Sequence, residues 1–275
     1  MTSANRLTNF QAVRWAAASL VVASHIYLEA SRVGTNVSLL SNASTFADLG
    51  VALFFVLSGW LMAGQMMQPE NPLRNYLQRR IIRIVPLYAL VTVGVVGFQI
   101  VISHNVEPVH WALSFLFLSQ ALGLGHPILY VGWTLEYEMF FYVLVGGTLL
   151  LKNVTLRFML SLSVLVLLST LSLLPPVVMY FAWGIAGHFV QLKLRPRASK
   201  MKAAFLTLFI VILLAFQVAS GMQVYANVAI LGLEIAILFF ALTRTWQIKS
   251  WLVGLLGDSS YAQYLVHVPV LTIVV

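Results

Sequence analysis

The chain has 275 residues, of which 60% are hydrophobic and only 9% are charged. Soluble domains carry about 25% charged residues, so this composition excludes a water-soluble fold and requires lipid around much of the surface. The absence of cysteine excludes disulfides, thiolate metal sites and a cysteine nucleophile. The formal net charge is +8, but the basic residues cluster between apolar runs, which indicates membrane topology rather than nucleic-acid binding.

Apolar runs of transmembrane length recur along the whole chain. A helix needs about 20 residues to cross the hydrocarbon core. We therefore predict an all-α, polytopic integral membrane bundle of about nine or ten transmembrane helices, in one domain over residues 1–275. The runs cover residues 10–28, 46–66, 84–102, 131–151, 155–173, 176–191, 203–219, 224–242 and 258–275, and a shorter run covers 110–122.

The basic residues between these runs predict the orientation. They gather at 74–83, 193–202 and 244–249. All three clusters face the cytoplasm if the N-terminus is cytoplasmic and 110–122 does not cross, as the positive-inside rule requires. We therefore predict about nine crossings of the cytoplasmic (inner) membrane, with 110–122 re-entrant or interfacial. The first run holds two ionisable residues and no small-residue cleavage site, so we interpret it as a retained helix rather than a signal peptide.

That first run carries Arg14 and His25. An ionisable side chain inside a span costs about 2.5 kcal/mol or more, which makes each one a functional candidate. The two residues are 11 positions apart, so they return to within about 20° of the same helix face and lie about 16 Å apart along it. Each alone is more simply a snorkelling arginine or a histidine bonded to a neighbouring helix. Their shared face favours the functional interpretation.

The run WTLEYEMFFY at 133–142 places two carboxylates at the start of a span. Glu136 and Glu138 point to nearly opposite sides of a helix, so they cannot line the same cavity. Thr134, Glu138 and Tyr142 share one face. We predict that Glu136 caps the helix N-terminus and that Glu138 faces inward, partnering His25 or Arg14.

In LQRRIIRIVPLY, Arg79 and Arg80 both reach Arg83 at helical spacing. Arginines at a membrane boundary usually anchor topology. Arginine forks also bind phosphates bidentately, so this cluster suits a phosphate-rich donor such as a coenzyme A thioester arriving from the cytoplasm.

Small residues interrupt the run FFVLSGWLMAG at 54–64. Ser58, Gly59 and Gly64 most simply allow close helix packing. We do not expect Ser58 to be a nucleophile, because the sequence places no base beside it.

The segment SSYAQYLVHVPV aligns Ser260, Tyr264 and His267 on one face. His267 is either a second polar residue of the cavity or a structural hydrogen-bond donor. We interpret His188 and Glu234, on otherwise apolar runs, as structural polar groups.

Taken in order, these motifs resemble the acyltransferase family 3 membrane proteins, which O-acylate sugars, glycolipids, cell-wall polymers and some antibiotics. The similarity runs nearly end to end. It includes the Arg-x10-His spacing of Arg14 and His25, the segment FFVLSGWLM, and RRIIRIVPLY with Arg80 and Arg83. It continues through WTLEYEMFFY with Glu138 and ends with SSYAQYLVH.

The resemblance implies transfer of an acyl group, most simply acetyl, from a cytoplasmic acyl-CoA to a carbohydrate-type hydroxyl. His25 would be the general base or a transient acyl carrier, and Arg14 would steady the donor or the oxyanion. Arg80 and Arg83 would bind donor phosphates, and Glu138 would orient the histidine or bind the acceptor. This chemistry is plausible in itself, because imidazole changes charge near neutral pH and a tetrahedral oxyanion needs a fixed cation or donor.

We expect Trp133, Tyr142 and His267 to contact substrate, and we expect neither a metal nor a permanently bound cofactor. The alternative function is a transporter that uses Arg14, His25 and Glu138 as a proton relay or substrate path. The lack of internal repeats disfavours a transporter built from symmetric halves. Family members commonly continue into a further helix, so we expect this chain to lack one, which also allows an inactive scaffold.

Overall fold

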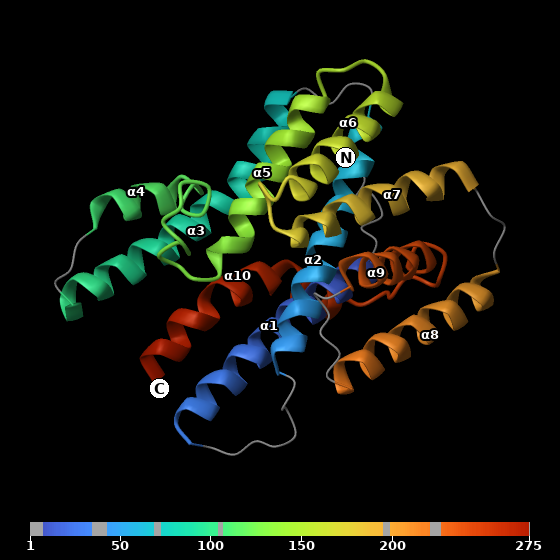
Figure 1. Cartoon of the computed structure of the whole chain (residues 1–275). Helices are drawn as coiled ribbons and strands as arrows, with labels where there is room; N and C mark the ends of the chain where they lie inside the picture. Colours follow the sequence, from blue (N-terminus) through green and yellow to red (C-terminus); the bar gives the residue numbers. More distant parts are fainter. Residues whose placement is uncertain are drawn as a thin grey trace.

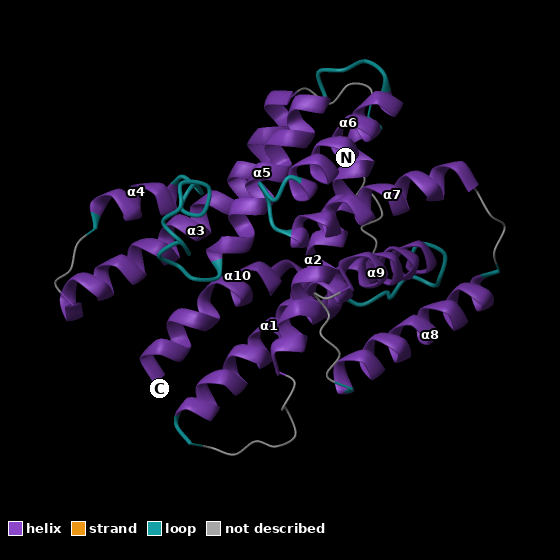
Figure 2. Cartoon of the chain, in the orientation of Figure 1, coloured by secondary structure: helices purple, strands orange, loops and turns teal. Residues whose placement is uncertain are grey.

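The computed structural model describes residues 8–34, 43–68, 73–103, 107–194, 199–220 and 227–274, and all regular structure within them is helical (Figures 1 and 2). This confirms the predicted all-α class. The helices are α1 (Thr8–Arg32), α2 (Ala43–Met66), α3 (Leu73–Ser103), α4 (Pro108–Phe115), α5 (Gly132–Thr148), α6 (Val154–Thr170), α7 (Met179–Leu194), α8 (Lys200–Ala219), α9 (Val228–Leu242) and α10 (Trp251–Val274), with a short 3-10 helix η2 (Pro176–Val178) before α7.

Each predicted run coincides with a helix, except the short one at 110–122. That run falls on the eight-residue α4 and the turns after it. At about 1.5 Å per residue, α4 is far too short to cross a core about 30 Å thick, which agrees with the prediction that 110–122 does not span. Arg195 and Arg197 of the second basic cluster lie outside the described residues.

The third helix differs from its predicted bounds. We expected a span over 84–102 preceded by a basic connection, but α3 begins at Leu73 and runs through Pro86 without ending. Its first turns therefore include Arg79, Arg80 and Arg83. Arginine is a good helix former, so a basic segment extends the helix rather than interrupting it.

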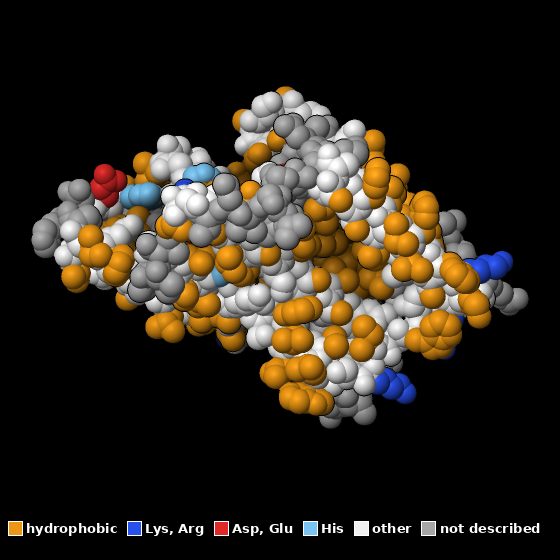
Figure 3. Space-filling model, turned by 90° about the horizontal axis from the view of Figure 1, so that it is seen from below, with side chains coloured by type: hydrophobic (Ala, Val, Ile, Leu, Met, Phe, Trp, Pro, Cys, Tyr) orange, Lys and Arg blue, Asp and Glu red, His pale blue; other side chains and the backbone are white. Residues whose placement is uncertain are grey.

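Within the part of the chain that the structure describes, three helices are long and apolar enough to cross a membrane, and they cover Ala43–Met66, Leu73–Ile102 and Lys200–Ala219. Val154–Thr170 and Val228–Leu242 are shorter apolar helices. Large apolar side chains also point outward, as on α8, where Phe205 is 66% exposed and Phe209 is 62% exposed. Hydrophobic side chains cover much of the face in Figure 3, with few Lys or Arg among them. The chain is thus a membrane protein whose surface is suited to lipid.

The centre of the bundle is α2, which packs extensively against α1 on one side and α7 on another, while α10 lies along α1 (Figure 1). Glycine makes the α2–α7 contact close. A Cβ on Gly59 would collide with the carbonyl oxygen of Phe181, and one on Gly184 would collide with that of Val56. Gly64 is looser, because its Cβ would meet only the His188 ring at 3.6 Å. The predicted packing role therefore belongs chiefly to Gly59.

One buried arginine joins the ends of two helices. Arg157 of α6 donates from Nη1 to the Met66 carbonyl (2.6 Å), from Nε to the Leu151 carbonyl (2.8 Å) and from Nη2 to the Leu149 carbonyl (3.4 Å). The last carbonyls of a helix have no intrahelical partner, so a guanidinium there satisfies them and complements the helix dipole. Arg157 holds the C-terminal ends of α2 and α5 together.

Candidate active site

Three arginines and one glutamate meet in a narrow pocket between α1, α2, α3 and α5. This arginine pocket has a volume of about 10 Å³, room for about one water molecule. Its lining residues are Arg14, Phe54, Leu57, Ser58, Leu61, Met62, Arg80, Arg83, Glu138 and Tyr142. Residues from four separate helices are therefore brought together, including five of the predicted site residues that the sequence could not place relative to one another.

Glu138 is buried in this pocket, with only 4% of the residue exposed. Its Oε1 accepts hydrogen bonds from the Ser58 hydroxyl (2.8 Å) and from the Tyr142 hydroxyl. Of the two alternative partners predicted for Glu138, Arg14 lines the same pocket, whereas His25 lies in another cavity and makes no hydrogen bond to Glu138. Glu138 lies away from His25 because the turn of α5 that carries it faces the turn of α2 that carries Ser58.

The arginine pocket contains more positive than negative charge. Arg14 donates from Nη1 to Gln11 Oε1 (3.0 Å), and Gln11 Nε2 donates to Asp258 Oδ1 (3.1 Å). The Nε atoms of Arg14 and Arg80 are buried and have no hydrogen-bond partner among the described residues. Buried donors normally find acceptors, so these two favour an anionic ligand.

Arg80 also lies against aromatic rings, with its guanidinium carbon 5.5 Å from the centre of the Tyr142 ring. Tyr142, predicted to contact substrate, therefore belongs to the arginine pocket. Gln11 and Asp258 were not singled out from the sequence. Asp258 could have been selected as a candidate from the sequence, because it is an acidic residue within a predicted span.

His25 lies in a different and larger cavity. This histidine chamber, of about 540 Å³, is lined by the C-terminal turns of α1, the first turns of α2, the segment 120–137 and parts of η2, α9 and α10. Trp133 and Tyr130 line the chamber too, and the Tyr130 ring centre is 6.1 Å from that of His25. The nearest imidazole is His267 of α10, whose ring centre lies 4.9 Å from that of His25.

The hydrogen bonds of the two imidazoles determine which nitrogens carry protons. His267 Nδ1 lies 2.7 Å from the Tyr264 carbonyl, and His25 Nδ1 lies 2.9 Å from the Val21 carbonyl. A carbonyl only accepts, so both Nδ1 atoms are N–H donors. The His25 Nδ1–H is shared with His267 Nε2 at 3.3 Å. His25 Nε2 is thereby left as the basic nitrogen, and no described residue hydrogen-bonds it.

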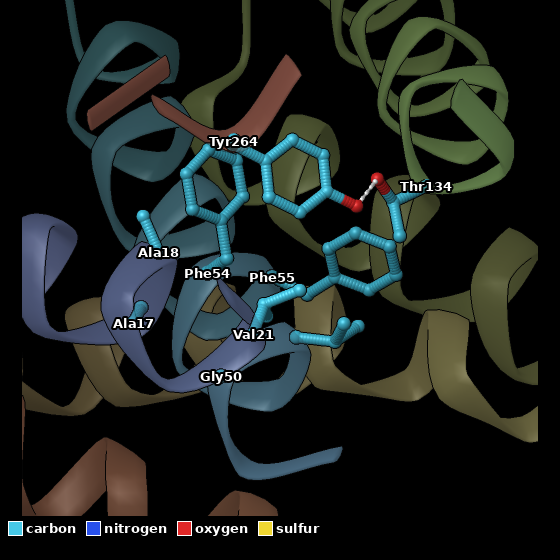
Figure 4. A pocket seen from close by; sticks show the side chains of 9 residues that line it. Ala17, Ala18, Val21, Gly50, Phe54, Phe55, Thr134 and Tyr264 are labelled. Carbon is cyan, nitrogen blue, oxygen red and sulfur yellow. Dashed lines mark hydrogen bonds between the residues drawn. The ribbon is translucent and has the colours of Figure 1, made fainter. Parts of the chain in front are cut away.

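A third, small apolar pocket, called the neck here, is lined by residues of α1, α2, α5 and α10 (Figure 4). Phe54 lines both the neck and the arginine pocket, whereas Val21 and Tyr264 line both the neck and the chamber. The Thr134 and Tyr264 hydroxyls lie 2.7 Å apart, and the Phe54 and Tyr264 rings are stacked with centres 6.4 Å apart. Arg14 and His25 thus line two separate cavities that share no lining residue, and the neck shares residues with each of them.

Glu136 does not cap its own helix, and that prediction is wrong. The N-cap of α5 is Val131, with no side-chain hydrogen bond. The Glu136 carboxylate instead accepts from the backbone N–H groups of Ser119 (3.0 Å) and Gln120 (2.9 Å). Glu136 cannot cap the helix start because it lies a full turn inside α5. Its two hydrogen bonds instead hold the loop at residues 119 and 120, which borders the histidine chamber at Gln120.

Within the described ranges, no group of three or more His, Asp or Glu side chains is arranged to hold a metal ion. The side chains that line the two sites supply imidazole, guanidinium, carboxylate and hydroxyl groups.

Comparison with known proteins identifies the class. A family model described as an acyltransferase domain matches residues 7–274, and the chain belongs to this family. It is also similar to the exopolysaccharide production protein ExoZ of Rhizobium meliloti (strain 1021), with 30% identity over 256 residues that cover 84% of this chain and 78% of the relative. No solved structure matches. The family resemblance is confirmed, and the chain is an acyltransferase rather than a transporter.

Proposed function

We propose that this protein transfers a short acyl group, most simply acetyl, from cytoplasmic acyl-CoA to a hydroxyl of a carbohydrate-type acceptor. The observation that carries the proposal is the pairing of two sites. The arginine pocket offers buried, unpartnered N–H donors to phosphates, and the histidine chamber offers a free imidazole nitrogen. The similarity to an exopolysaccharide production protein supports a polysaccharide or its precursor as the acceptor.

In this proposal the donor lies across both sites. The arginine pocket, which in this structure has room for about one water molecule, must widen to admit the phosphates of coenzyme A. These phosphates then bind Arg80, Arg83 and Arg14, since guanidiniums form short charge-assisted bonds to phosphate oxygens. The long pantetheine arm then covers the distance of about 16 Å that separates Arg14 from His25 along α1. The thioester carbonyl reaches His25 at the end of that arm. Arg14 is too far from His25 to stabilise the oxyanion, so we assign it to the phosphates.

The chemical step takes place in the histidine chamber. His25 Nε2 removes the proton of the acceptor hydroxyl while its oxygen attacks the thioester carbonyl. The tetrahedral intermediate collapses, the carbon–sulfur bond breaks, and the coenzyme A thiolate leaves with the proton that His25 returns. His267 Nε2 accepts a hydrogen bond from His25 Nδ1–H, which keeps the proton on Nδ1 and leaves His25 Nε2 free to act as the base. Trp133 and Tyr130 line the space left for the acceptor.

The first experiment measures thiol release from acetyl-CoA by the full chain in lipid nanodiscs, for the wild type, His25→Ala and His188→Ala. Loss of a general base lowers kcat by about 10²–10⁴-fold, so His25→Ala should be nearly inactive. His188 lies on α7 outside both sites, and its variant should keep wild-type activity. A folded His25→Ala protein with normal turnover would exclude the proposed base.

The second experiment separates donor binding from chemistry. Arg83→Ala should lower kcat/KM for acetyl-CoA by about 10-fold or more, because a charge-assisted hydrogen bond contributes about 1.5–3 kcal/mol. The same variant should match the wild type with acetyl-pantetheine, which lacks the nucleotide phosphates. Equal losses with both donors would mean that Arg83 has a structural role and does not bind phosphate.

A further inference from the structure

An apolar groove adjoins the histidine chamber along α5. Its volume is about 380 Å³, and it is lined by the loop after α4, one side of α5 and the turn before η2. The principal apolar residues of this lateral groove are Leu116, Leu118, Met139, Phe140, Val143 and Leu173. None of them is used by the reaction proposed above, although the groove shares two lining residues with the chamber that contains His25.

The lateral groove and the histidine chamber share Gln120 and Tyr137. The Tyr137 hydroxyl donates to Gln120 Oε1 (3.0 Å), and Gln120 Nε2 donates to the Trp133 carbonyl (3.2 Å). The backbone of Gln120 is held in turn by Glu136. A fixed amide and phenol therefore form the boundary between a polar cavity and an apolar one, and the amide keeps one N–H and one lone pair for a ligand.

The groove runs away from the chamber along α5. From Tyr137 to Val143 the helix rises about 9 Å. The residues at its walls remain open to the bilayer, because Val143 is 64% exposed, Leu116 63% and Leu173 67%. A molecule occupying both cavities must be polar at one end, beside His25, and hydrocarbon at the other.

We propose that the acceptor is a lipid-linked sugar, with the sugar in the histidine chamber, its first linkage beside Gln120 and Tyr137, and its hydrocarbon chain in the lateral groove. The inference rests on the proposed function and names the class of acceptor. An acceptor without a chain would leave the groove to bulk lipid. A lipid-linked acceptor is instead confined to the bilayer by its chain, and packing of that chain in the groove holds its sugar in the chamber that contains His25.

Binding is tested without turnover by photolabelling. The full chain in nanodiscs is irradiated with a dodecyl glucoside that carries a diazirine at the end of its chain, and the labelled residues are mapped by mass spectrometry. We expect labelling at 139–143 and 116–118, which excess dodecyl glucoside removes and excess phospholipid of the same chain length does not. Labelling spread over all lipid-facing helices, or equal competition by phospholipid, would overturn the proposal.

Turnover is tested with acetyl-CoA and a panel of sugars, each presented as a methyl glycoside and as a dodecyl glycoside. The wild type should favour the dodecyl form by at least 10-fold in kcat/KM. Val143→Trp fills the groove and should abolish this preference without changing methyl glycoside turnover. The matched control is Val93→Trp on α3, also exposed (56%) but outside the groove, which should keep the preference.

The two levels of failure are distinguishable. A preference that survives Val143→Trp would reject the groove and leave the acyltransferase function intact. Thiol release that does not depend on His25 would reject the proposed function instead, whatever the photolabelling shows.

Discussion

Two buried hydroxyls depend on the carboxylate of Glu138 as their hydrogen-bond acceptor. Ser58 and Tyr142 both donate to Glu138 Oε1, and all three residues are buried. Leaving a buried donor without an acceptor costs about 1–3 kcal/mol, which is more than the hydrogen bond contributes when it is formed. Glu138 is therefore structural as well as part of the arginine pocket.

We predict that Glu138→Leu lowers stability by about 1–3 kcal/mol for each donor left unpaired, whereas Glu138→Gln keeps an acceptor oxygen and remains close to the wild type. Thermal unfolding of the purified proteins measures the difference. Equal melting temperatures for the two variants would show that the hydroxyls find other partners. Measuring KM for acetyl-CoA on the same Gln variant then reports the effect of the lost charge alone.

At the scale of single residues, the cost of burying charge selected side chains that the structure brings together, whereas the direction in which a side chain points could not be predicted. Arg14, Arg80, Arg83 and Glu138 were selected as charges in or near apolar spans, and they do share one pocket. The direction of Glu136 was wrong, because its acceptor contacts are to a loop 16 and 17 residues away along the chain. No local pattern predicts such a partner.

Among the contacts between helices, the α2–α7 contact leaves almost no space for an added side chain. Gly59 and Gly184 lie where the two backbones approach most closely, and either side chain would meet the other helix at a carbonyl oxygen. Small residues at such crossings are the usual means by which membrane helices gain close packing.

We predict that Gly184→Ala destabilises the protein by about 1–3 kcal/mol, because the added methyl has no space and the helices must separate. The matched control is Gly147→Ala on α5, where a Cβ meets nothing within 4 Å. That substitution should be neutral or stabilising by up to about 1 kcal/mol, since alanine is the better helix former. Melting temperatures that fall equally for both variants would contradict the proposed close contact.

For the whole molecule, the open question of orientation has a direct test. The chain contains no cysteine, so a single introduced thiol is the only one in the protein. The N-terminus-in topology that we propose places Glu107, before α4, outside and Lys152, between α5 and α6, in the cytoplasm. Both side chains are exposed.

We predict that Glu107→Cys reacts with a membrane-impermeant maleimide in intact cells, whereas Lys152→Cys reacts only after permeabilisation. The wild type, without a thiol, is the background control. The reverse pattern would invert the topology and place the arginine pocket towards the outside, which would exclude a cytoplasmic donor.

The sequence by itself determined the class of molecule and the identity of most candidate residues. Composition and run length require helices in lipid, and charges inside spans are too costly to be accidental, so both conclusions depend on local properties of the chain. Only the tertiary structure decided which helices meet. It separated His25 from the arginines, paired it with His267 of α10, and placed an apolar groove against the chamber that contains His25. Those relations join residues far apart in the chain, and they follow from how the helices pack rather than from the periodicity of any one of them.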